Sequence, residues 1–146
     1  MIWKPRTTVA AVVEQNDRFL LVEEEINGKM TLNQPAGHLE PDESLIDAVI
    51  RETKEETAWT FHPQSLVGIY RWIHPRKGET YIRYCFSGTV SNHDPDQPLD
   101  DDIHQALWLP FEEVRRRQAD LRSTLVSDCF QDYIDGHRYP LDILRN

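Results

Sequence analysis

The segment GHLEPDESLIDAVIRETKEETAW, residues 37–59, carries the most informative pattern in the sequence. Its pattern changes from loop chemistry to helical spacing, which predicts a helix over residues 43–57 with Asp42 as the N-cap after Pro41. One mostly apolar face of this helix is formed by Ile46, Val49, Ile50, Thr53 and Thr57. We expect that face to pack against the core, which leaves the other side of the helix for polar groups.

Three glutamates crowd a different stripe of the same helix. Glu52, Glu55 and Glu56 stand at positions i, i+3 and i+4, within about 100° of one another around the helix axis. Like charges at this spacing destabilise a helix by about 0.2–0.5 kcal/mol per pair. One interpretation is a solvated acidic face. The other is a site for a hard cation such as Mg²⁺ or Mn²⁺, which prefers oxygen ligands and binds phosphates.

The flanks of the glutamate stripe favour the cation site. The segment contains a glycine, then five residues, a glutamate, seven residues, an Arg-Glu pair and finally a Glu-Glu pair. These fixed positions are Gly37, Glu43, Arg51, Glu52, Glu55 and Glu56. This spacing resembles the Nudix box. Three positions depart from it, because Thr53 and Trp59 stand where aliphatic residues are usual and Ala58 replaces a glycine. None of the three removes a predicted metal ligand.

The resemblance implies a role for each box position. The carboxylates of Glu52, Glu55 and Glu56, with the Gly37 carbonyl, would hold one to three Mg²⁺ or Mn²⁺ ions, and Gly37 would also allow a tight turn. Arg51 and Glu43 would form a structural ion pair between the helix and the loop before it. The implied reaction is hydrolysis of a nucleoside diphosphate linked to another group, with a metal-activated water that attacks phosphorus.

Nudix enzymes often add a carboxylate from a loop that leads to a tryptophan-containing strand. Asp102 precedes Trp108 at the spacing expected for that extra ligand or base, and Asp101 is the next candidate. A solvated acidic loop is the alternative. The general base is left open between Glu52, Asp102 and another box glutamate.

Four further residues are candidates for substrate binding. Arg83 lies in the middle of a predicted strand, on the same face as Tyr81 by strand alternation. Asn33 and Gln34 directly precede a proline, and His38 follows the box glycine. Each also has a plain structural interpretation: an outward arginine, turn chemistry and a structural histidine.

The rest of the chain alternates strands and helices. Strands are predicted over residues 7–14, 18–26, 31–34, 66–73, 81–90 and 106–109, and helices over 111–117 and 124–135. This order predicts a mixed α/β fold. With the resemblance, we expect a single Nudix domain over residues 1–146, as an α/β/α sandwich with a mixed sheet and the box as loop, helix and loop.

Composition limits the partners. The chain has 146 residues, and its 25 acidic and 16 basic side chains give a net charge of −9, which argues against long nucleic acid as a partner. No apolar run approaches the roughly 18 residues of a membrane span, and the N-terminus lacks the features of a signal peptide. Cys85 and Cys129 lie far apart among apolar neighbours, which fits a reducing, cytoplasmic compartment. The expected partner is a small nucleotide or pyrophosphate, bound by a monomer or a homodimer.

The resemblance extends beyond the box. The segments INGK, NQPAGHLE, LRS and HRYPL, between Lys4 and about Leu141, look like one bacterial phosphatase type within this family. That type acts on nucleoside tri- and diphosphates and on pyrophosphates of the thiamine pathway. The alternatives are a pyrophosphatase of ADP-ribose or another nucleotide sugar, an enzyme on capped RNA ends, a Nudix module that senses a nucleotide without cleaving it, and a plain acidic domain.

Overall fold

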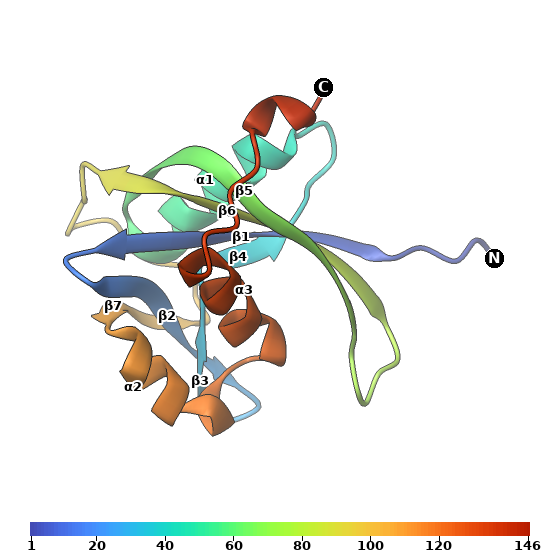
Figure 1. The fold of residues 1–146 in the computed structure, drawn as a ribbon. Coiled ribbons are helices and arrows are strands. Elements are labelled where there is room, and N and C mark those ends of the chain that lie inside the picture. The colour runs from blue at the N-terminus through green and yellow to red at the C-terminus, as the bar shows by residue number, and fades with distance from the viewer.

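A computed structural model describes residues 1–146 and shows a curved sheet between helices (Figure 1). Its strands are β1 (Arg6–Gln15), β2 (Arg18–Ile26), β3 (Lys29–Asn33), β4 (Ala36–His38), β5 (Thr60–Ile73), β6 (Thr80–Ser91) and β7 (Ile103–Leu109). Its α-helices are α1 (Leu45–Thr57), α2 (Phe111–Arg116) and α3 (Thr124–Ile134), and two short 3₁₀ turns cover Gln118–Asp120 and Leu141–Ile143. The helices are too short or too polar for any of them to span a bilayer.

The seven strands form one mixed sheet. The main path runs β3-β2-β1-β6-β5, while β4 pairs with β1 and β7 pairs with β2. Only β1 and β6 pair in parallel, with Val9 opposite Tyr84. The β1–β2 turn forms at Asn16 and Asp17, whose φ angles of 53° and 63° suit a tight hairpin.

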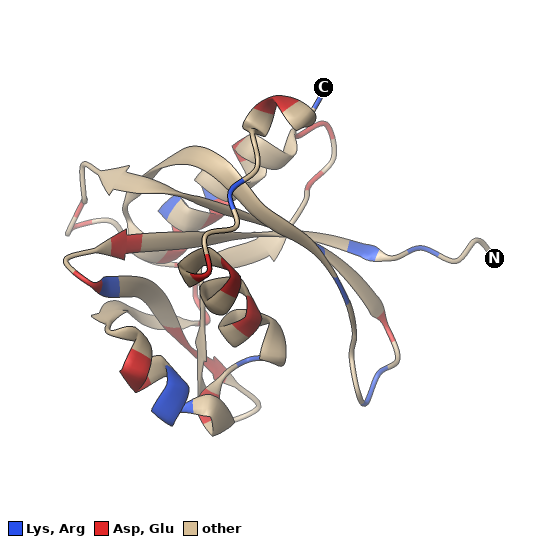
Figure 2. Cartoon of the chain, in the orientation of Figure 1, with Lys and Arg blue, Asp and Glu red and all other residues tan.

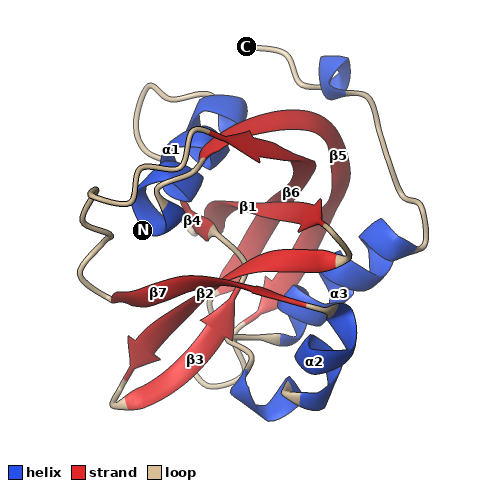
Figure 3. Cartoon of the chain, turned by 90° about the vertical axis from the view of Figure 1, so that its left-hand side faces the viewer, coloured by secondary structure: helices blue, strands red, loops and turns tan.

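Helices cover both faces of the sheet, with α1 on one side and α2 and α3 on the other (Figure 3). A hydrophobic core lies on each face of the sheet, and the alternating side chains of β1 contribute to both. Val9 and Val13 pack with Val49 of α1, whereas Val12 packs with Phe130 of α3. The predicted mixed α/β fold is confirmed. Cys85 of β6 and Cys129 of α3 are both free, and both are buried in the core between the sheet and α3.

Several boundaries differ from the predicted ones. Helix α1 begins two residues later, because the Ser44 hydroxyl accepts a hydrogen bond from the Asp47 amide at 3.0 Å and acts as the N-cap in place of Asp42. Asp42 instead has a φ of 63°, in the turn before the cap. Strand β5 begins at Thr60 rather than residue 66, because an edge strand with a bulge after Pro63 tolerates the missing amide of proline. The three-residue strand β4 was too short to predict.

Ala58 ends helix α1 in the left-handed conformation usual for glycine. Its φ is 63°, and its amide donates to the Lys54 carbonyl at 2.9 Å. A side chain in this conformation costs about 1–2 kcal/mol. The Ala58 methyl group is buried in the core, which offsets part of that cost. Helix α1 therefore ends in the left-handed conformation that glycine usually adopts, although the residue here is alanine.

Candidate active site

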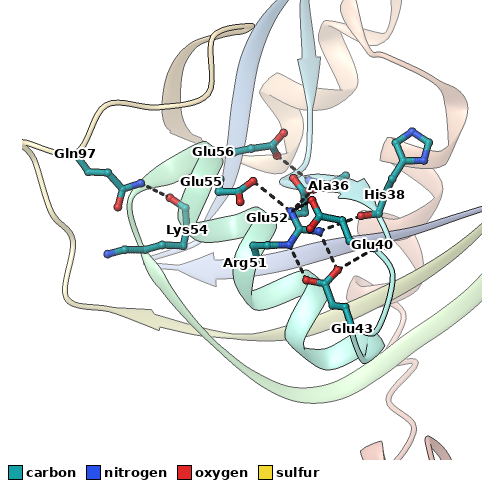
Figure 4. A network of polar contacts seen from close by, with 10 residues as sticks. All are labelled: Ala36, His38, Glu40, Glu43, Arg51, Glu52, Lys54, Glu55, Glu56 and Gln97. Atoms are coloured by element: carbon teal, nitrogen blue, oxygen red, sulfur yellow. Dashed lines mark hydrogen bonds and ion pairs between the residues drawn. The ribbon is translucent and has the colours of Figure 1, made fainter. Parts of the chain in front are cut away.

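Arg51 joins the loop before α1 to the glutamates on the helix (Figure 4). Its Nε and NH2 donate to the two oxygens of Glu43 at 2.6 and 3.0 Å. Its NH1 donates to Glu52 at 2.9 Å and to Glu55 at 3.2 Å, and NH2 also reaches the carbonyl of His38 at 3.0 Å. A single guanidinium thus orients three carboxylates and one backbone carbonyl.

The charges around Arg51 stabilise one another. The hydrogen bonds from Arg51 hold the pKa of Glu43 below its usual value, so Glu43 stays ionised. The hydrogen bond to Glu43 in turn raises the pKa of Arg51. Glu52 behaves differently, because burial raises its pKa and Arg51 offsets only part of that effect. Glu43 and Arg51 therefore form an ion pair that supports the site. Glu52 is a more basic carboxylate than Glu43.

Gly37 allows a close approach of a side chain rather than a tight turn. It lies in strand β4 with an ordinary negative φ, so the tight turn expected at this glycine is wrong. A Cβ atom at Gly37 would lie 2.0 Å from Cδ of Glu52 and 2.2 Å from its Oε1. The missing side chain is what lets the Glu52 carboxylate rest against β4.

Gly37→Ala is therefore expected to displace the Glu52 carboxylate. The atom in conflict is the end of a flexible side chain, so we expect the protein to fold with little change in melting temperature. A misplaced reacting group should lower kcat by about 10-fold. Thermal melting and steady-state kinetics check this. Gly78→Ala is the control outside the site, since an added Cβ there would meet no atom within 4 Å, and its φ of 70° should cost stability but leave turnover unchanged. Unchanged turnover in Gly37→Ala would contradict the prediction.

Asp100 is the loop carboxylate that joins the box glutamates. Carboxylate oxygens of Glu52, Glu55 and Asp100 lie within 4.8 Å of one another. The loop is held there because the Asp100 amide donates to the Glu55 carbonyl at 3.1 Å, and Gln97 caps the Lys54 carbonyl at 2.6 Å. Asp102 is outside this group, and its backbone carbonyl accepts from strand β2 instead. Nothing in the triplet at residues 100–102 marks the first aspartate by sequence.

Glu56 is the most enclosed of the box carboxylates. It is 8% exposed, and its Oε1 accepts a hydrogen bond from the Ala36 amide of β4 at 2.9 Å. Burial, with added repulsion from Glu52 and Glu24, raises the pKa of Glu56 to about 9. A buried anion without a partner is costly. The position therefore favours either a proton or a cation beside Glu56.

These residues suit a divalent cation. Oxygen atoms less than 4.8 Å apart are compatible with ligands of one ion, since Mg²⁺ binds oxygen at about 2.0–2.1 Å. A cation would also supply the opposite charge that the buried Glu56 lacks. Glu52, Glu55 and Asp100 could hold it directly, with Glu56 next to them on α1.

A cavity of about 180 Å³ lies along strand β4 beside the carboxylates. Ala36 and Gly37 line it, and these are the two residues that contact Glu56 and Glu52. Among the predicted substrate-binding residues, Asn33, His38 and Arg83 line the cavity. The ring of His38 points away from the glutamates (Figure 4).

Gln34, the fourth predicted substrate-binding residue, does not line the cavity but contacts Arg83, which does. It is fully buried, and its amide donates to the Ala11 carbonyl at 3.0 Å. Its Oε1 accepts a hydrogen bond from NH1 of Arg83 at 3.0 Å. Arg83 itself is only 7% exposed, so it is not an outward arginine on a half-exposed sheet. Gln34 therefore orients Arg83.

A wider groove of about 730 Å³ continues from the cavity and shares Trp72, His74, Arg122 and Ser123 with it. Its cationic side chains are Lys29, Arg76, Lys77 and Arg122, and no Asp or Glu lines it. Figure 2 shows basic positions at the tip of the β5–β6 hairpin, although the chain as a whole has a net negative charge. Such a local positive field favours an anionic ligand.

Comparison with known proteins agrees with this geometry. A NUDIX domain model matches residues 4–128. Relatives named "Phosphatase NudJ" from Escherichia coli strain K12 and Shigella boydii are each 43% identical over 143 residues, covering 98% of this chain and 92% of theirs. The resemblance of nearly the whole chain to a bacterial phosphatase type is confirmed.

Solved structures give the same result. A NUDIX hydrolase from Nitrosomonas europaea is 53% identical with a TM-score of 0.96, over 98% of this chain and 97% of that one. A MutT protein from Methanosarcina mazei Go1 is 25% identical with a TM-score of 0.74, over 92% of this chain and 97% of that one. The observed architecture is thus shared with a solved hydrolase of this kind over nearly the whole chain.

Proposed function

Because the chain belongs to the Nudix hydrolases, which act on phosphoanhydrides, we propose that it hydrolyses nucleoside tri- and diphosphates or thiamine-type pyrophosphates with Mg²⁺. The observation that carries this proposal is that strand β4 contacts both the box carboxylates and the cavity. Ala36 and Gly37 contact the buried carboxylates, and the same residues line the cavity. A substrate in the cavity would present its phosphates to the carboxylate group.

Each residue has a distinct task in this proposal. A divalent cation held by Glu52, Glu55, Asp100 and Glu56 would polarise phosphoryl oxygens and lower the pKa of a water. Arg51 keeps Glu52 and Glu55 in place through its two hydrogen bonds. Arg83 places a guanidinium on the cavity wall, where it would offset negative charge on the substrate.

Glu52 is the proposed general base. Its Oε1 accepts a hydrogen bond from Arg51, whereas its Oε2 has no partner within the chain. Burial raises the pKa of Glu52, which brings its proton affinity closer to that of a base working near neutral pH. Oε2 is therefore the atom to receive the proton of the attacking water.

Phosphate release from a substrate panel tests the proposal. The panel contains nucleoside tri- and diphosphates, thiamine pyrophosphate and ADP-ribose, each with Mg²⁺, with EDTA, and with and without added pyrophosphatase. We expect direct release of orthophosphate from the tri- and diphosphates, lost in EDTA and restored by excess Mg²⁺. Turnover of ADP-ribose alone would favour a nucleotide-sugar pyrophosphatase. Tight nucleotide binding without any release would favour a sensing module.

A further inference from the structure

One end of the sheet is basic, although the net charge of the chain is negative. This end consists of residues 1–6, which lead into β1, and residues 71–79, at the tip of the β5–β6 hairpin. Both segments line one groove of about 580 Å³, in which Trp3 and Lys4 lie with Lys77 and Gly78. The two segments therefore form one continuous surface, which we call the basic end.

The basic end carries five exposed cationic side chains and a single carboxylate. The carboxylate is Glu79, and the cations are Lys4, Arg6, Arg71, Arg76 and Lys77. Only Arg6 is paired, because its guanidinium binds Glu79. Figure 2 shows basic positions on the segment before β1 and on the hairpin. Such a cluster of unpaired cations creates a local field that attracts an anionic partner.

Large apolar side chains are exposed among these cations. Trp3 is 72% exposed and Ile73 is 49% exposed. By strand alternation Ile73 shares one face of β5 with Ile69 and Arg71, and both of these are exposed too. Tryptophan is favoured at the boundary between water and lipid. Binding to a bilayer surface scales with buried apolar area and with attraction to anionic lipids, and the basic end provides both.

The acidic residues of the loop before β7 lie at the other end of the sheet. Strand β6 connects the two ends, because it begins at Thr80 beside the hairpin tip and ends at Ser91, just before that loop. At about 3.3 Å per residue, its 12 residues span roughly 35 Å along the strand. Charges are screened over about 8–10 Å at physiological salt. The acidic loop therefore repels an anionic surface at the basic end only weakly.

We propose that the basic end docks the protein on an anionic lipid surface. Trp3 and Ile73 enter the headgroup region, and the unpaired cations contact lipid phosphates. A second copy of the chain suits this surface less well, because a two-fold contact would bring the cations of two basic ends together. The inference is separate from the proposed hydrolysis, since docking needs neither the cavity nor the box carboxylates.

Sedimentation with lipid vesicles tests the proposal. The vesicles contain phosphatidylcholine alone, or phosphatidylcholine with about one third phosphatidylglycerol. EDTA is present throughout, so that no metal ion bridges the box carboxylates and the lipid phosphates. We expect the partition coefficient to be about 10-fold or more higher on the anionic vesicles, and to fall when salt is raised to about 1 M. Tryptophan emission should shift to shorter wavelength on these vesicles, and the shift should be smaller in Trp3→Ser.

A matched pair of double variants tests the role of the cations. Arg76→Gln with Lys77→Gln should lower the partition coefficient on anionic vesicles about 10-fold or more, since each cation near an anionic surface adds to binding. Arg115→Gln with Arg116→Gln is the control, because it removes the same charge from exposed positions on α2. The control should change partition by about 2-fold or less.

A second pair tests the apolar contact. Ile73→Ser should lower the partition coefficient about 5-fold, because less apolar area leaves water on docking. Ile134→Ser is the control, since Ile134 is 46% exposed at the end of α3, outside the basic end. Thermal melting of each variant confirms that it folds.

Several outcomes overturn the proposal. Equal partition onto neutral and anionic vesicles, or none onto either, removes the lipid contact. A control pair that loses as much binding as the basic-end pair shows that overall charge, and not this surface, is responsible. Self-association without lipid that Ile73→Ser abolishes, measured by sedimentation velocity, assigns the surface to a second copy. Binding to polyglutamate as tight as to the anionic vesicles assigns it to an acidic protein.

Discussion

Glu56→Gln is expected to lower kcat by about 10²–10⁴-fold and, at the same time, to make the metal-free protein more stable. The two effects have one cause. The Glu56 carboxylate is buried on α1 against β4, where its negative charge is stabilised only by a cation beside it. Glutamine keeps the hydrogen bond from Ala36 through its own oxygen, but it cannot balance the charge of a metal ion.

The stability change depends on pH in a defined direction. Burial raises the pKa of folded Glu56 to about 9, against an ordinary value of 4.5. A group with a raised folded pKa contributes stability that is fully present below its unfolded pKa and is lost as pH rises through the folded pKa. The metal-free wild type should therefore lose stability between about pH 5 and pH 9. Glu56→Gln should remove that loss.

Chemical unfolding in EDTA at several pH values measures this effect. Since one pKa unit corresponds to about 1.4 kcal/mol and pH 8 lies about 3.5 units above the ordinary pKa of 4.5, we expect Glu56→Gln to gain up to about 5 kcal/mol at pH 8 and nothing at pH 4. Glu55→Gln is the matched control: its side chain is 41% exposed and paired with Arg51, so it should gain no stability while it also loses activity. A fully active Glu56→Gln would show that Glu56 is only structural. A variant no more stable than wild type at pH 8 would contradict the burial argument.

The secondary structure and the box were predictable because they depend on local patterns. Apolar spacing over residues 43–57 predicts a helix wherever it occurs, and the fixed offsets of the charged residues place the glutamates on one stripe of it. The N-cap was harder, since Asp42 and Ser44 are both good caps. Ser44 is chosen because its hydroxyl reaches the Asp47 amide, whereas Asp42 adopts a left-handed turn.

The cavity was only partly predictable because its wall comes from distant segments. Arg83 and Asn33 were identified from their own strands, but Glu24 belongs to the cavity wall only through its hydrogen bonds from Asn33 and Arg122. Arg122 is held there because its amide donates to the Leu32 carbonyl at 2.8 Å. Within its own segment, RFLLVEEEI, Glu24 is one of three consecutive glutamates. Only the paired strands show which of the three points inward.

The orientation of the loop aspartates also depends on contacts with a distant segment. Spacing from Trp108 favours Asp102 as the extra carboxylate, but spacing along a loop does not determine where its side chains point. The hydrogen bond from the Asp100 amide to the Glu55 carbonyl ties residue 100 to the end of α1. The carboxylate beside Glu52 and Glu55 is therefore that of Asp100.

Asp100→Asn is expected to lower kcat/KM by about 10–100-fold and to raise the Mg²⁺ concentration needed for half-maximal activity. The substitution keeps the backbone hydrogen bond to Glu55 and removes one negative charge from the carboxylate group. Asp102→Asn is the matched control, because it removes the same charge two residues away and should change activity by about 2-fold or less. Mg²⁺ titrations of both variants at one substrate concentration compare them directly. A larger loss in Asp102→Asn would return the role to the residue that the spacing favours, and it would mean that the loop moves when metal and substrate bind.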